Sequence, residues 1–136
     1  MGAWDLGPFE NDGAMDFFGA MMDSLPADWP RLMTETMSEV LAVDYVENPE
    51  MQGAVAAASL LASRLDPTLG LPRHYRDQWF AARFEVTPEL RELATGTFAR
   101  AFDEHANEWF ELWTEAGTFP EVTKLLAPYR QALTRR

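Results

Sequence analysis

An imidazole and a carboxylate on one helix face could bind a metal ion or exchange protons, and His105 and Glu108 have the spacing for it. Residues three apart lie on the same side of a helix, and helical periodicity runs through this stretch. Di-iron bundles use a Glu-x-x-His pair on each of two helices, whereas here the order is reversed and no second pair exists. His105 is also in register with Phe98 and Trp109. We therefore expect it to be a partly buried structural residue.

The other residue types suited to catalysis form no recognisable site. The chain has no cysteine, which excludes disulfides, thiolate metal ligands and a cysteine nucleophile. No serine lies in a Gly-x-Ser-x-Gly turn, and there is no glycine-rich phosphate loop or dinucleotide motif. Acidic pairs at four-residue spacing are typical of solvated helix faces; here they include Asp12 with Asp16 and Glu35 with Glu39. The sequence therefore predicts no catalytic residue, no metal site and no cofactor.

The negative charge is concentrated in the first part of the chain. Residues 1–60 hold eleven acidic residues against one base, Arg31, for a net charge of −10, whereas residues 61–136 have a net charge of −1. An acidic surface repels nucleic acid and anionic membranes, so neither is an expected partner. It favours association with a basic protein.

This charge distribution predicts a non-enzymatic protein-interaction domain that binds a basic protein, for example as the immunity or regulatory partner of a toxin. The candidate interaction surface consists of Trp4, Asn11, Asp12, Asp16, Glu35 and Glu39. A second hypothesis is a small-ligand or metal-binding protein, or an enzyme, that uses Asp12, Asp16, His105 and Glu108. A third is a homo-oligomeric scaffold that self-associates through an exposed stripe of Met and Trp side chains.

The expected location is the cytoplasm. No run of apolar residues approaches the roughly 18 that a membrane span needs, and the opening residues lack the basic and apolar regions of a secretory signal. The absence of cysteine suits a reducing compartment.

Apolar residues recur at three- and four-residue spacing along most of the chain, and no segment alternates as a strand would. The sequence predicts an all-α, compact single domain over residues 1–136, with an irregular N-terminal arm at 1–11 and five to seven helices. Helices are expected at 12–25, 28–41, 48–65, 87–116 and 118–133, and the aromatic residues of 74–84 suggest a short helix in a stretch whose pattern is ambiguous. The stretch 87–116 is longer than a typical helix, so the sequence leaves open either one continuous helix or a break at Asn107. The predicted N-caps are Asn11 or Asp12, Asn48, Thr87 and Thr118, the last in a capping box with Glu121. Gly117 is expected just after a helix end.

A specific motif opens the chain, formed by Gly2, Trp4, Gly7, Pro8, Phe9, Asn11, Asp12, Ala14 and Asp16. It resembles the start of a bacterial family known as domain of unknown function 4259, although Asp5 stands where that family usually has glycine. The later stretch from Glu108 to Gly117 is similar to the family's Glu-Leu-Trp-x-Glu-Ala-Gly segment. The resemblance covers nearly the whole chain and implies a small helical cytoplasmic protein, with no activity attached. We expect Trp4 and Phe9 of the arm to dock on the bundle.

Overall fold

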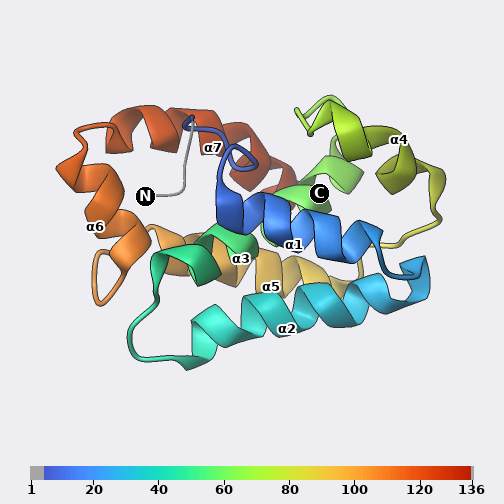
Figure 1. Ribbon diagram of the computed structural model, residues 1–136, viewed down its shortest axis with the longest axis horizontal. Helices are drawn as coiled ribbons and strands as arrows, with labels where there is room; N and C mark the ends of the chain where they lie inside the picture. The colour runs from blue at the N-terminus through green and yellow to red at the C-terminus, as the bar shows by residue number, and fades with distance from the viewer. Residues whose placement is uncertain (1–4, 136) are drawn as a thin grey trace.

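The computed structural model describes residues 5–135 of the 136-residue chain. Along this stretch the helices are α1 (Asp12–Met22), α2 (Trp29–Ala42), α3 (Asn48–Leu65), α4 (Arg73–Ala81), α5 (Pro88–Ala101), α6 (Glu108–Glu115) and α7 (Phe119–Thr134), and a 3-10 turn (Pro26–Asp28) precedes α2 (Figure 1). No β-strand forms within these residues. The prediction of an all-α fold with five to seven helices is confirmed.

Helix α3 is the centre of the fold, and every residue from Met51 to Ser63 is buried. A helix that is buried all round must be small or apolar on every side. The small residues of this helix are Gly53, Ala54, Ala56, Ala57, Ala58 and Ser59, and small residues let neighbouring backbones come close. Helices α1, α2, α5, α6 and α7 all pack on α3. No helix of residues 5–135 is long and apolar enough to cross a bilayer.

The short helix α4 is anchored by its aromatic residues, as its sequence predicts. Trp79 is fully buried, its ring lies 5.3 Å from that of Trp29, and its indole N–H donates to the Ser63 hydroxyl at 3.1 Å. The guanidinium of Arg64 lies 4.4 Å from the centre of the Trp79 ring and donates to the Ala82 carbonyl at 3.0 Å. These contacts join α4 to α2 and α3.

Most of the predicted helix ends are confirmed. Asn11 accepts a hydrogen bond from the Ala14 N–H at 2.8 Å, and Thr87 accepts one from the Leu90 N–H at 3.2 Å. The break at Asn107 is present, because α5 ends at Ala101 and Asn107 is the N-cap of α6. Gly117 follows α6 with a φ of 72°, a left-handed conformation that favours glycine.

One predicted cap is wrong, and another lacks the hydrogen bond expected of it. The N-cap of α3 is Glu47 rather than Asn48, and the Asn48 N–H donates instead to the Glu108 carboxylate at 2.7 Å. A carboxylate of α6 therefore accepts a hydrogen bond from the first turn of α3, which a local capping side chain would otherwise accept. Thr118 is the N-cap of α7, as predicted, but it makes no capping hydrogen bond, and its buried hydroxyl has no partner among the described residues.

The first helix is also three residues shorter than predicted. It ends at Met22 because Pro26 keeps Leu25 extended and because the Trp29 indole N–H occupies the Met21 carbonyl at 2.8 Å. Leu25 is left exposed.

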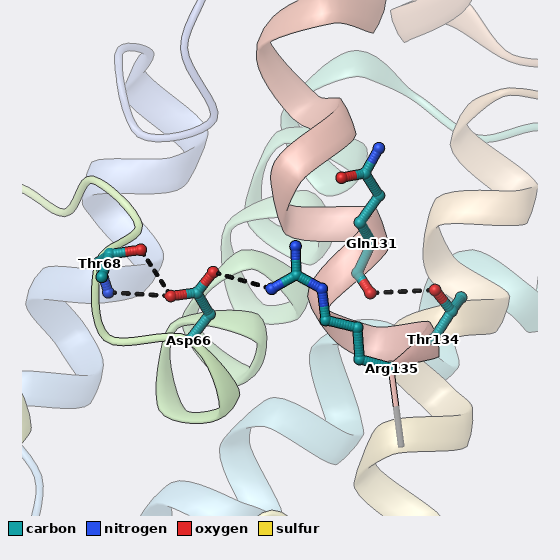
Figure 2. A network of polar contacts seen from close by, with 5 residues as sticks. All are labelled: Asp66, Thr68, Gln131, Thr134 and Arg135. Atoms are coloured by element: carbon teal, nitrogen blue, oxygen red, sulfur yellow. Dashed lines mark hydrogen bonds and ion pairs between the residues drawn. The ribbon is translucent and has the colours of Figure 1, made fainter.

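The end of α7 is tied to the loop that follows α3 (Figure 2). The Asp66 carboxylate accepts from the backbone N–H and the hydroxyl of Thr68, at 3.1 and 2.6 Å, and pairs with Arg135 at 3.5 Å. The hydrogen bonds from Thr68, and then the charge of Arg135, hold the pKa of Asp66 below its usual value. This network fixes where the 66–72 loop leaves α3.

The described part of the N-terminal arm is irregular and docks on the bundle. Phe9 is buried, with its ring 5.9 Å from that of Phe18 in α1 and 6.4 Å from that of Tyr129 in α7. Gly7 lies against the Glu10 side chain, since a Cβ atom there would lie 2.2 Å from the Glu10 carboxylate, which would have to move. The predicted docking of Phe9 is confirmed, whereas Trp4 lies outside the described residues.

Candidate functional site

Two segments without Lys or Arg meet at the N-terminal end of α3. Residues 32–63 and 101–123 contain no Lys or Arg. The Val46 N–H donates to the Ala106 carbonyl, and the Glu108 N–H donates to the Val46 carbonyl, both at 3.0 Å. These bonds form an isolated parallel bridge between Val46 and Asn107. The loop after α2 is thereby held against the start of α6.

Eleven carboxylates lie in these two segments, from Glu35, Glu39, Asp44, Glu47, Glu50, Asp103, Glu104, Glu108, Glu111, Glu115 and Glu121. The division of the sequence into an acidic first half and a nearly neutral second half therefore misses part of the negative surface. Within each segment no Lys or Arg separates neighbouring acids along the chain, so their charges add to one another. Two bases from outside the segments lie beside them: Arg31 pairs with Glu35, and the Arg100 guanidinium donates to the His105 and Ala106 carbonyls.

A cleft of about 320 Å³ opens where the loop after α2 meets α3. It is lined by Glu39, Val40, Val43, Tyr45, Val46, Glu47 and Glu50. We call these residues, together with Glu108 and Glu111, the acidic corner. Val40 and Val46 are fully buried, whereas Val43 is 42% exposed and Tyr45 is 46% exposed. The corner thus combines exposed apolar surface with a surplus of negative charge.

The polar groups of the corner are acceptors of hydrogen bonds and cations. The Tyr45 hydroxyl makes a long hydrogen bond of 3.4 Å to the Glu111 carboxylate. Desolvation, and then the charges of Glu111, Glu108 and Glu47, raise the pKa of Tyr45, so the phenol stays neutral. One carboxylate oxygen of Glu50 is buried and has no hydrogen-bond partner in residues 5–135. A positively charged group would satisfy these carboxylates, whereas an anion would be repelled.

The match to a known family covers most of this structure. The model of the family described as Domain of unknown function (DUF4259) matches residues 2–124. The chain belongs to this family. The match includes the opening motif, both segments of the acidic corner and the start of α7. No curated protein and no solved structure matches the chain.

The sequence-predicted surface residues of this DUF4259 protein do not lie in one place. Glu39 lines the corner cleft. Glu35 is exposed on α2 and pairs with Arg31 at 3.1 Å. Asp12 and Asp16 are exposed on α1, outside the lining of the corner cleft.

Asn11 differs from the acidic members of that surface because it is 4% exposed and caps α1. Its side chain is therefore part of the fold rather than of an open surface. Trp4, the remaining member, lies outside the described residues.

The predicted position of His105 is wrong. The break before α6 places it in an exposed turn rather than on a helix beside Glu108. The Glu108 carboxylate accepts from the Asn48 N–H at the start of α3, and the His105 carbonyl accepts from Arg100 at 2.9 Å. No group of three or more His, Asp or Glu side chains that could hold a metal ion occurs in the part of the chain described. Asp12, Asp16, His105 and Glu108, on which the second hypothesis rests, therefore do not form a metal-binding cluster in the described residues.

The Met and Trp stripe required for self-association is not exposed on the described residues. The side chains of Met21, Met22, Met33, Met37, Met51, Trp29, Trp79, Trp109 and Trp113 are buried, and Met15 is half-buried. Homo-oligomerisation stays a prediction, without that surface to support it.

Sequence reasoning missed Val43, Tyr45, Glu47, Glu50 and Glu111 as site residues. The two segments without Lys or Arg are a signal that could have drawn attention to them. Their meeting could not be read from the chain, because Val46 and Ala106 are far apart in sequence and their contact is backbone hydrogen bonding.

Proposed function

We propose that this protein is a non-enzymatic interaction domain that binds a basic protein partner in the cytoplasm, and that the acidic corner is its binding surface. The observation that carries the proposal is the exposure of Val43 and Tyr45 among carboxylates in two segments without Lys or Arg. Exposed apolar groups of this kind are common at protein interfaces, where tyrosine is enriched.

The corner suits a lysine or arginine side chain from the partner. The aliphatic part of such a side chain would pack on Val43 and Tyr45, while its charged end would meet Glu39, Glu47 or Glu50. A cation over the Tyr45 ring would add a further attraction. A partner that presents several basic residues would be steered toward the surface by the surrounding charge.

The role of an immunity or regulatory partner of a toxin fits this mode of binding. Such a role needs a stable complex with a basic protein and no chemistry of the domain's own. The charge and the exposed apolar groups support the binding, and the identity of the partner is what the experiment must supply.

The test is capture of the partner by tagged wild-type protein and by two charge-reversal variants. The corner variant is Glu47→Lys with Glu50→Lys, and the matched control is Glu85→Lys with Glu92→Lys, which changes the net charge equally at exposed positions away from the corner. We expect wild type and control to retain a basic protein in defined stoichiometry and the corner variant to lose it. Circular dichroism checks that each variant is folded.

Two further measurements separate the corner from general charge. Tyr45→Ala, which changes no charge, should weaken the captured complex because tyrosine contacts are strong in interfaces. The association rate should fall steeply as the ionic strength rises. Equal loss of the partner in the corner and control variants would contradict the assignment to the corner. So would full retention of the partner by both the Tyr45→Ala variant and the corner variant.

A further inference from the structure

A second cleft, separate from the acidic corner, lies between the N-terminal arm and α7. Its volume is about 450 Å³, within the range of small-molecule sites, which is roughly 300 to 1,000 Å³. Its walls come from the arm, from Met15 of α1, from the 70–72 loop and from Tyr129. Figure 1 shows the arm looping back beside α7 before it enters α1. The cleft is therefore bounded by segments from both ends of the chain.

Most of the cleft wall is apolar, and its aromatic residues are fixed by the fold. Phe9 and Tyr129 pack edge to face with their ring centres 6.4 Å apart, and both are less than a tenth exposed. The 66–72 loop is held at its start by the Asp66 network (Figure 2) and at Gly70 by a hydrogen bond from Tyr129. A ligand would meet a wall that is largely formed in advance, which lowers the entropic cost of binding.

The polar groups of this wall accept hydrogen bonds. The Tyr129 hydroxyl donates to the Gly70 carbonyl at 2.5 Å, so its only proton is in use and its oxygen lone pairs are left. Burial, and then the charge of Glu10, raise the pKa of Tyr129 to about 12, so this proton stays in place at neutral pH. Glu10 adds a carboxylate, and no basic side chain is among the residues that line the cleft.

The surroundings of Glu10 disfavour its charged form, and a nearby cation would counteract this. Burial, followed by the nearby charge of Asp5, raises the pKa of its carboxyl, while hydrogen bonding from the Gly7 backbone lowers it in part. Neither carboxylate forms an ion pair with a Lys or Arg of residues 5–135, and two neighbouring carboxylates repel each other. A positive charge beside Glu10 would favour the ionised form of both.

We propose that this cleft binds a small organic amine in its protonated form. The ammonium group is held by the Glu10 carboxylate and the Tyr129 oxygen, and the apolar body of the ligand packs on Phe9, Met15 and Leu71. The inference is independent of the proposed function, because neither Glu10 nor Tyr129 belongs to the acidic corner.

The probe is 1-hexylamine, with 1-hexanol as a neutral molecule of the same length. Titration of isotope-labelled protein, followed by two-dimensional NMR, reports both the affinity and the residues that bind. We expect saturable shifts at residues 8–10, 15, 70–72 and 129, and an affinity for hexylamine about tenfold or more above that for hexanol, as suits hydrogen bonds to charged groups.

Variants identify the groups that act. Glu10→Gln keeps the size of the side chain and should weaken hexylamine binding about tenfold or more while leaving hexanol binding unchanged. The matched control Asp16→Asn removes one charge from an exposed position of α1 that does not line the cleft, and it should bind as wild type does. Amine binding should also weaken as the pH falls through the pKa of Glu10, because protonation removes the charge.

Four results would overturn the proposal, of which three concern the affinity. They are the absence of saturable hexylamine binding, equal affinities for hexylamine and hexanol, and an unchanged hexylamine affinity in a folded Glu10→Gln variant. Shifts confined to the acidic corner would also overturn it, and they would do so without bearing on partner binding there. The corner variant Glu47→Lys with Glu50→Lys should keep the amine affinity of wild type.

Discussion

Removal of the Asn107 side chain is expected to destabilise the protein more than the loss of an ordinary helix cap. Asn107 is fully buried between α5 and α6. Its amide nitrogen donates to the carbonyls of Arg100, Ala101 and Asp103, at 3.1, 2.9 and 3.0 Å, and its amide oxygen accepts from the Phe110 N–H at 3.2 Å. One side chain therefore ends one helix and begins the next.

The magnitude follows from these two roles. Loss of a helix cap costs about 1 kcal/mol of unfolding free energy. The buried Ala101 carbonyl, left without its donor from Asn107, costs about 1 to 3 kcal/mol more, whereas the Arg100 carbonyl keeps a bond from the Asp103 N–H. Asn107→Ala should therefore lower the free energy of unfolding by roughly 2 to 4 kcal/mol. Thr87→Ala is the control, because Thr87 makes only the capping bond to Leu90, and it should cost about 1 kcal/mol.

Asn107→Asp separates the two roles. Aspartate caps a helix as well as asparagine does, but it would point a second oxygen at three carbonyl oxygens. We expect Asn107→Asp to be at least as destabilising as Asn107→Ala at neutral pH. The measurement is urea unfolding followed by tryptophan fluorescence, with the free energy extrapolated to water. An Asn107→Asp variant as stable as wild type would refute the argument from the donor bonds, and so would equal costs for Asn107→Ala and Thr87→Ala.

Two further predictions concern tight packing and pH. Gly13→Ala should destabilise the protein by about 1 to 3 kcal/mol, because a Cβ atom there would lie 2.7 Å from the Pro49 carbonyl. Gly96→Ala should instead stabilise it by about 0.4 to 1 kcal/mol, because a Cβ atom there would make only ordinary contact with Leu41 at 3.6 Å. Thermal melts of both variants check the contrast. The pKa of Asp66 is lowered in the folded protein, so its contribution to stability is present above the usual value of 3.8 and is lost as the pH falls through the lower folded value. Urea unfolding from pH 7 to 2 should show the difference in stability between wild type and Asp66→Asn disappearing in acid. A difference that stays constant would contradict this.

The helices were predictable because their signals are local. The apolar spacing and the caps Asn11, Thr87 and Asn107 act within one or two turns of the chain. The failure at Asn48 has a different origin. Its N–H is satisfied by Glu108, sixty residues away, so the cap of α3 depends on how α6 packs. Local signals cannot report an acceptor that only the tertiary structure supplies.

The candidate site was predictable in its chemistry but not in its position. The surplus of acidic residues is visible in the sequence, and Glu39 was among the residues that it suggested. Tyr45 carried no signal, because an aromatic residue in a sequence is more often buried than exposed. His105 was misplaced for a related reason. The helical spacing of apolar residues continues from α5 into α6 across residues 102–107, and this suggested a buried face for His105.

The opening motif of the family is explained largely by folding. Phe9 fills the core, Asn11 caps α1 and Ala14 is fully buried, while Gly7 lies against the Glu10 side chain. Asp12 is exposed, but a carboxylate in the first turn of a helix is favoured by the helix dipole. The resemblance to the family therefore carries the architecture, and it does not by itself locate a function.

The acidic corner has no comparable structural explanation. Exposure of Val43 and Tyr45 forgoes the stabilisation that burial of apolar surface provides, and like charges crowded around Tyr45 oppose the compact state. Both features would be favourable against a basic, partly apolar surface. Sites where a sequence departs from what folding alone favours are where function is expected. The same reasoning applies to Glu10, a half-buried carboxylate placed beside Asp5 without a basic partner lining its cleft.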